Sequence, residues 1–210
     1  MSIAAPTVNA RTLIRSKERV KDLAEVFTPD WIVRNMLDLV GDVTHLPETT
    51  FLEPSCGNGN FLTQILDRKL TTVFARHRQT AYAERQILRS VMSIYAVDID
   101  ETNVRDARAR LLDRIDEAWR EAFRRVEMTA ATRAAIEAVL AHNVRVCDFL
   151  NGRDECVMTE YIYMMSRYIC KDFRLSDPAK TFRSRGPFLL SELPVALAET
   201  PRPDRADRII

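Results

Sequence analysis

Two glycines, Gly57 and Gly59, lie between short apolar segments in the stretch Phe51-Leu-Glu-Pro-Ser-Cys-Gly-Asn-Gly-Asn-Phe-Leu62. Glycine tolerates positive φ and has no Cβ to keep a ligand away, so this spacing indicates a sharp turn between a strand and a helix. The N–H groups of such a turn and of the first helical turn lack internal partners and favour an anion such as a carboxylate. Glu53 adds an acidic side chain at the end of the same strand.

Acidic residues also follow two later apolar segments. Asp98 follows residues 91–97, and Asp148 follows residues 143–147. Predicted strands alternate with predicted helices along this part of the chain, which indicates an α/β domain with a mostly parallel sheet. Ligands of such sheets bind beyond the carboxyl ends of the strands. We therefore expect the glycine turn, Asp98 and Asp148 to meet at one edge of the sheet.

Hydrophobic periodicity predicts the elements that position these groups. Thr28 is a suitable N-cap for a helix that starts at Pro29. Further predicted helices follow Gly59 and cover the segment up to about residue 89, residues 103–128 and residues 129–141, and predicted strands cover residues 51–54, 91–97, 143–147 and 160–165. We expect residues 1–24 to form a flexible or helical arm, residues 25–190 the domain and residues 191–210 a tail.

The composition favours a cytoplasmic protein that is not bound to a membrane. The 210 residues are 46% hydrophobic and 29% charged, and no apolar run approaches the length of a membrane span. A net charge of +1 provides no global attraction to nucleic acid. The four cysteines show no Cys-x-x-Cys spacing and the three histidines are isolated, so we expect reduced thiols and no metal site.

Four segments, in this order and spacing, resemble the amino-terminal half of S-adenosylmethionine-dependent DNA adenine-N6 methyltransferases, the modification enzymes of restriction–modification systems. They are Val26-Phe-Thr-Pro29, Glu53-Pro-Ser-Cys-Gly-Asn-Gly-Asn-Phe61, Ile94-Tyr-Ala-Val-Asp-Ile99 and Val146-Cys-Asp-Phe149. The resemblance covers about residues 24–152. It implies a Rossmann-like class I methyltransferase fold, S-adenosyl-L-methionine as cofactor and DNA as partner, which is bound directly or through a partner subunit.

The resemblance also implies a role for each matching residue. The glycine turn would cradle the methionine part of the cofactor, and the acids after the second and third strands would bind the ribose hydroxyls and the adenine amino group. The cofactor-binding candidates are Phe27, Thr28, Pro29, Glu53, Cys56, Gly57, Asn58, Gly59, Asp98, Ile99, Asp148 and Phe149. The alternative is that these residues have structural roles. The glycines would then form an ordinary strand-to-helix turn, and Asp148 would be a loop residue. Asp98 would cap the following helix, a role that Asp100 could fill equally well.

One motif of that family is missing. Adenine methyltransferases of this type carry Asn/Asp-Pro-Pro-Tyr/Phe after a fourth strand, whereas this chain contains no Pro-Pro pair. Glu160 and Tyr161 lie roughly where that strand is expected and supply a carboxylate and an aromatic ring, so they are the candidates for the acceptor site. The chain also lacks an obvious target-recognition domain.

The sequence is compatible with three functions. The chain is a methyltransferase subunit completed by another polypeptide or by a second copy, or a non-catalytic DNA- or protein-binding member of the fold. The third is a small-molecule methyltransferase with a divergent acceptor site. The Phe-Thr-Pro segment argues against this third interpretation, because the resemblance associates it with DNA modification.

Overall fold

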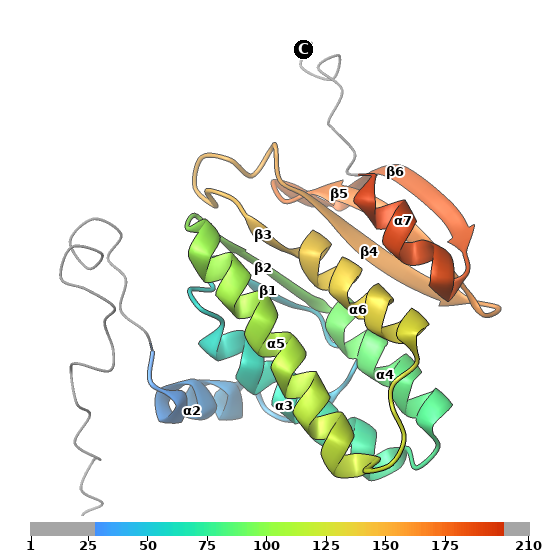
Figure 1. The fold of residues 1–210 in the computed structure, drawn as a ribbon. Coiled ribbons are helices and arrows are strands. Elements are labelled where there is room, and N and C mark those ends of the chain that lie inside the picture. Colours follow the sequence, from blue (N-terminus) through green and yellow to red (C-terminus); the bar gives the residue numbers. More distant parts are fainter. Residues whose placement is uncertain (1–27, 200–210) are drawn as a thin grey trace, which may run out of the picture.

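A computed structural model describes residues 28–199 of the protein. The first sheet along the chain is parallel and has three strands (Figure 1). Its strands are β1 (Phe51–Glu53), β2 (Ile94–Asp98) and β3 (Val144–Val146), and β2 lies in the centre. Phe51 pairs with Ile94, and Ala96 pairs with Val144. The predicted arm, residues 1–24, lies outside the described residues.

Helices cover one face of this sheet (Figure 1). They are α3 (Asn60–Arg76), α4 (Thr80–Met92), α5 (Glu101–Ala122) and α6 (Ala130–Asn143), and α2 (Asp30–Val40) packs on α3. Ile94, Ala96 and Val144 share one buried apolar cluster with the inner faces of these helices. The expected α/β architecture with flanking helices is therefore present. None of the helices in the described part of the chain has the length and apolarity that crossing a membrane requires.

A second sheet follows, and it is antiparallel. Its strands are β4 (Val157–Met164), β5 (Arg167–Arg174) and β6 (Asp177–Phe188), in that order. Tyr95 and Val97 of β2 form a separate buried cluster with Met158 of β4 and its neighbours. The expectation of a mostly parallel sheet is thus wrong for residues 157–188. A two-residue turn at Met165 and Ser166 joins β4 to β5, and such a short connection permits antiparallel pairing only.

A buried polar network joins α6 to the antiparallel sheet. The Thr159 amide donates to Oδ1 of Asn143 (3.3 Å), and the Asn143 amide donates to the Thr159 carbonyl (3.1 Å). The Thr159 hydroxyl donates to Asp172 (2.6 Å), which also accepts two bonds of 2.9 Å from Arg185. Arg185 in turn donates to the carbonyl of Ala196. One chain of hydrogen bonds therefore links α6, all three antiparallel strands and the last helix.

That last helix lies within the segment expected to be a tail. Residues Leu190–Glu192 form η3 and Leu193–Ala198 form α7, which packs on α6. Leu193 and Leu197 are buried in the main core. The expected tail is therefore wrong for residues 193–198, because these apolar side chains gain more from burial than the short segment loses on ordering.

Element boundaries also differ from the predicted ones. Helix α4 continues to Met92, so the apolar residues Val91 and Met92 belong to the helix rather than to β2. Helix α5 ends at Ala122 instead of residue 128. Helix α2 has Pro29 at its N-cap position and makes no side-chain capping bond, so the predicted Thr28 cap is absent. A short 3-10 helix, η2 (Asp42–His45), follows α2.

Candidate functional site

The glycine turn and Asp98 meet at the carboxyl edge of the parallel sheet. The Gly57 amide donates to Oδ2 of Asp98 at 2.8 Å, and the Cys56 amide donates to the Val97 carbonyl at 3.0 Å. The Cys147 amide donates to the Asp98 carbonyl at 2.9 Å, which brings the end of β3 to the same edge. Gly57 has a φ of 50°, a value that side-chain-bearing residues seldom adopt.

The Asp98 carboxylate is buried, and hydrogen-bond donors of the protein take most of its acceptor positions. Its Oδ1 accepts from the Asp100 amide at 2.9 Å and from the Asn103 side chain at 3.4 Å. A carboxylate offers about four acceptor positions, and three of them are taken here. Asp98 therefore has capacity for one ligand hydroxyl, rather than both hydroxyls of a ribose. The capping role falls to Asp100, whose side chain accepts from the Asn103 amide at 3.0 Å.

Gly59 serves helix packing. It adopts the left-handed conformation, with a φ of 89°, at the start of α3. A Cβ at this position would lie 3.0 Å from the Cβ and 3.1 Å from the Cα of Ala107 on α5. The absence of a side chain therefore allows α3 and α5 to approach closely, which is a different requirement from ligand access.

The other predicted residues of the turn are not reactive groups. Cys56 is buried and its thiol donates to the Gly57 carbonyl at 3.5 Å. Burial, followed by the charges of Asp98 and Glu53, raises the pKa of Cys56 to about 12, so the thiol stays protonated. Burial also raises the pKa of Glu53, whose Oε1 accepts from the Ser55 amide at 3.4 Å. Neutral Cys56 is a poor nucleophile.

The segment before α2 is tied to the glycine turn. Arg110 of α5 donates to the Asn58 carbonyl at 2.8 Å and to Oδ1 of Asn60 at 2.7 Å. The Asn60 side chain donates to the Thr28 carbonyl at 2.9 Å. Thr28 and the adjacent Pro29 are thus brought to the predicted site, whereas Phe27 lies outside the described residues.

Sequence reasoning did not identify Asn60 and Arg110 as part of this site. Arg110 lies on a long charged helix, where an arginine ordinarily indicates a solvated face. No local pattern reveals that it bonds a turn 52 residues earlier. Asn60 lies within the segment that resembles the family, but its sequence position does not indicate which residues its side-chain amide contacts.

Asp148 is engaged by its own loop. Its carboxylate accepts from the Leu150 amide (2.9 Å), the Asn151 amide (3.1 Å) and the Asn151 side chain (2.9 Å). These bonds, that of the Asn151 side chain first, lower the pKa of Asp148. Phe149 packs against the second core cluster, and the Arg153 guanidinium lies 5.4 Å from its ring. This geometry corresponds to the loop alternative for Asp148.

The unpaired atoms near the turn fit a ligand that donates hydrogen bonds. Oδ1 of Asn58 and Oδ1 of Asn103 are buried, and neither has a partner among the described residues. Ile99, directly after β2, is 61% exposed and offers an apolar surface at the same edge. S-adenosylmethionine carries an ammonium group and ribose hydroxyls, which are donors of the kind that these two oxygens lack.

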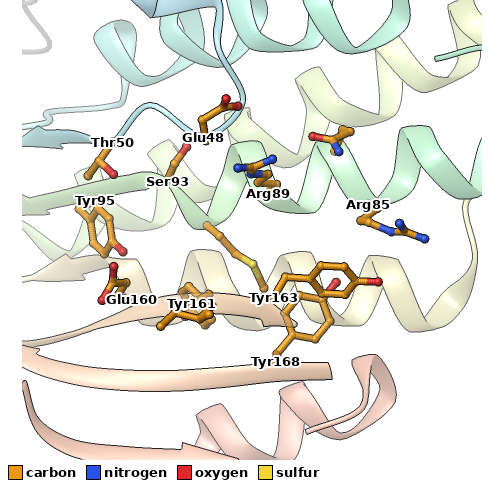
Figure 2. A pocket seen from close by; sticks show the side chains of 13 residues that line it. Glu48, Thr50, Arg85, Arg89, Ser93, Tyr95, Glu160, Tyr161, Tyr163 and Tyr168 are labelled. Carbon is orange, nitrogen blue, oxygen red and sulfur yellow. The ribbon is translucent and has the colours of Figure 1, made fainter. Parts of the chain in front are cut away.

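The acceptor candidates lie at the opposite edge. Glu160 and Tyr161 line a cavity of about 500 Å³ together with Thr50 and Ser93, which directly precede β1 and β2 (Figure 2). The Tyr161 hydroxyl is buried without a partner in the described structure, and burial raises its pKa well above the usual value. The structure does not bring Glu160 or Tyr161 to the carboxyl edge, because β4 joins an antiparallel sheet instead of extending the parallel one.

Comparison of the chain with protein-family models, with curated proteins and with solved structures found no match.

Proposed function

We propose that the carboxyl edge of β1–β3 binds S-adenosyl-L-methionine, and that the chain is a DNA methyltransferase-like protein of the restriction–modification type. The hydrogen bond between Gly57 and Asp98 carries the proposal, because it joins two independently predicted segments at the edge where α/β sheets bind ligands. The unpaired oxygens of Asn58 and Asn103 support it. The family resemblance supplies the cofactor and the link to adenine-N6 methylation.

The same proposal holds that the chain is incomplete on its own. The chain has no Pro-Pro motif, and Glu160 and Tyr161 lie at the other edge of the sheet. Within the described residues, β1 is an outer strand and pairs on one side alone. An enzyme that acts on a base must offset the cost of unstacking it, which requires an acceptor pocket beside the cofactor. A second polypeptide would supply that pocket.

Calorimetric titration with S-adenosylmethionine tests the cofactor site. We expect saturable binding that Asp98→Ala weakens and that Asp154→Ala, a change in an exposed loop, leaves unchanged. Absence of binding at millimolar cofactor, or equal binding by Asp98→Ala, would refute the site. Transfer of labelled methyl groups to mixed DNA by the isolated chain would refute the claim that it is incomplete.

A non-catalytic binding protein is the second candidate. The position of Glu160 and Tyr161 away from the glycine turn favours it. The two candidates differ in the complex isolated from the native host: transfer to DNA by that complex supports the incomplete methyltransferase, and its absence supports the non-catalytic protein.

A further inference from the structure

Helix α2 has an apolar face that nothing within residues 28–199 covers. The helix packs on α3, and its buried side chains are Val33 and Leu37. Met36, Leu39 and Val40 are 47%, 89% and 54% exposed. Figure 1 shows α2 at the rim of the domain, beyond α3. Single exposed apolar residues are ordinary, but three on one short helix indicate a contact surface.

The exposed residues continue the apolar face that packs on α3. Successive helical residues are about 100° apart around the axis, so Leu39, Met36, Val40, Val33 and Leu37 follow one another over an arc of about 160°. The buried pair occupies one end of this arc, and the exposed three occupy the rest. Helix α2 therefore has apolar surface for a second neighbour besides α3.

The chain that precedes α2 enters the described structure next to this surface. Pro29 has a φ of −58° and a ψ of 145°, so the backbone is not helical there, and a residue before proline disfavours helix. The Asn60 side chain holds the Thr28 carbonyl at 2.9 Å. The chain therefore changes direction just before α2. A helix that ended near residue 25 would be joined to α2 by a short connection, and such connections, of about 2–5 residues, make antiparallel helix pairs.

The sequence of the preceding segment suits this position. Leu13, Val20, Leu23 and Ala24 fall on one side of a helix drawn through residues 13–25, because their spacing follows the 3.6-residue period. Such a helix would be slightly longer than α2, which has 11 residues. It would therefore span the whole exposed face.

The charges of the two segments have opposite signs. Residues 11–25 contain five Lys and Arg against three Asp and Glu, whereas residues 30–45 contain three Asp and one Arg. The acids in the second range are Asp30, Asp38 and Asp42. Complementary charge favours contact between these segments over contact of either one with a copy of itself.

The size of the face favours a partner from the same molecule. A stable interface between separate proteins uses about 20–30 residues on each side, more than the 11 residues of α2 provide. A segment tethered beside the surface needs less area, because the connection gives it a high effective concentration.

We propose that residues 13–25 form a helix that packs antiparallel on the exposed apolar face of α2 within the same molecule. The apolar side of that helix covers Met36, Leu39 and Val40, and its basic side faces solvent beside the acids of α2. The proposal concerns a surface separate from the carboxyl edge of β1–β3 and does not depend on a bound cofactor.

Amide hydrogen exchange of the full chain without cofactor tests the proposal. We expect the amides of residues 13–25 to exchange about tenfold more slowly in the wild type than in Leu39→Glu, which places a charge in the apolar contact. Leu23→Glu should remove the same protection from the other side. Val195→Glu is the matched control, because Val195 is an apolar helical residue with 70% exposure on α7. This variant should keep the protection.

Leu39 and Val195 are exposed, and unchanged exchange in β2 establishes that the variants fold. Fast exchange throughout residues 13–25 of the wild type overturns the proposal, as does equal protection in Leu39→Glu. Protection that rises with protein concentration also overturns it, because a second copy would then cover the face. Since no cofactor is present, the outcome is independent of the titration with S-adenosylmethionine.

Discussion

The amide nitrogen of Gly57 lies 2.8 Å from Oδ2 of Asp98, which is 41 positions later in the chain. This contact and the bond from the Cys56 amide to the Val97 carbonyl tie the turn after β1 to the end of β2. We expect Asp98→Ala to lower the free energy of unfolding by about 1–3 kcal/mol, because the Gly57 and Asp100 amides lose their acceptor. Asp98→Asn keeps one acceptor oxygen and should lose less. Urea unfolding of the three proteins measures both effects, and equal stability would show that the contact is dispensable.

Gly59→Ala should destabilise the fold through α5. Its added Cβ would lie 3.0 Å from the Cβ of Ala107 in a backbone with positive φ, so we expect a loss of about 2–4 kcal/mol. Gly41→Ala is the control, since Gly41 also has positive φ (85°) but nothing lies within 4 Å of its added Cβ. Thermal melting should show the larger loss for Gly59→Ala. A loss of the same size in both variants would mean that the backbone conformation, rather than the close approach of α5, requires glycine.

Lys69 of α3 is fully buried and holds the loop before β1. Its Nζ donates to the carbonyls of Leu46 (3.0 Å), Pro47 (3.1 Å) and Thr49 (2.6 Å) and to Oγ of Ser93 (2.7 Å). Burial lowers the pKa of Lys69 to about 7, while four surrounding oxygens favour the ammonium form.

We expect Lys69→Met to cost about 3 kcal/mol of unfolding free energy, because it leaves the carbonyls without a donor. Arg114→Met, which removes an exposed pair with Asp67 and Glu117, should cost about 1 kcal/mol or less. Chemical denaturation of both variants provides the comparison. A Lys69→Met protein as stable as the wild type would show that solvent reaches these carbonyls.

We expect His142 to make the stability of the protein depend on pH. It is buried beside Leu197, and the charges of Arg145, Asp172 and Arg185 act on it. Burial, followed by the charge of Arg145, lowers the pKa of His142 from 6.5 to about 4. Between these values the unfolded chain binds more protons, so stability is full above about pH 6.5 and is lost as the pH falls toward 4.

The loss attributable to His142 should reach about 3 kcal/mol. His142→Gln removes the titrating group, so its unfolding free energy should change less over the same interval. Urea unfolding of both proteins at several pH values measures the difference. Parallel pH profiles would mean that groups other than His142 cause the acid sensitivity.

The sequence predicts the carboxyl edge because its signals are local. Gly57, Gly59 and Asp98 follow short apolar runs, and a strand end places them without knowledge of distant contacts. In the second sheet the sequence predicts β4 alone, as the strand at residues 160–165. Every residue of β6 is exposed or half-buried, so the strand shows no apolar alternation, and α7 has six residues, too few to establish a helical period. Paired buried groups, such as Asp172 with Arg185, look like solvated charges in the sequence.

The two sheets also impose different folding orders. β4 and β5 pair across Met165 and Ser166, so this hairpin needs no distant segment and can close within microseconds. In the parallel sheet, by contrast, Phe51 must find Ile94, and Ala96 must find Val144, each across an intervening helical region. Such non-local pairing is slow because the loops must close first. During synthesis the glycine turn therefore leaves the ribosome well before Asp98, the residue that holds it, and in that interval it lacks the support of the folded sheet.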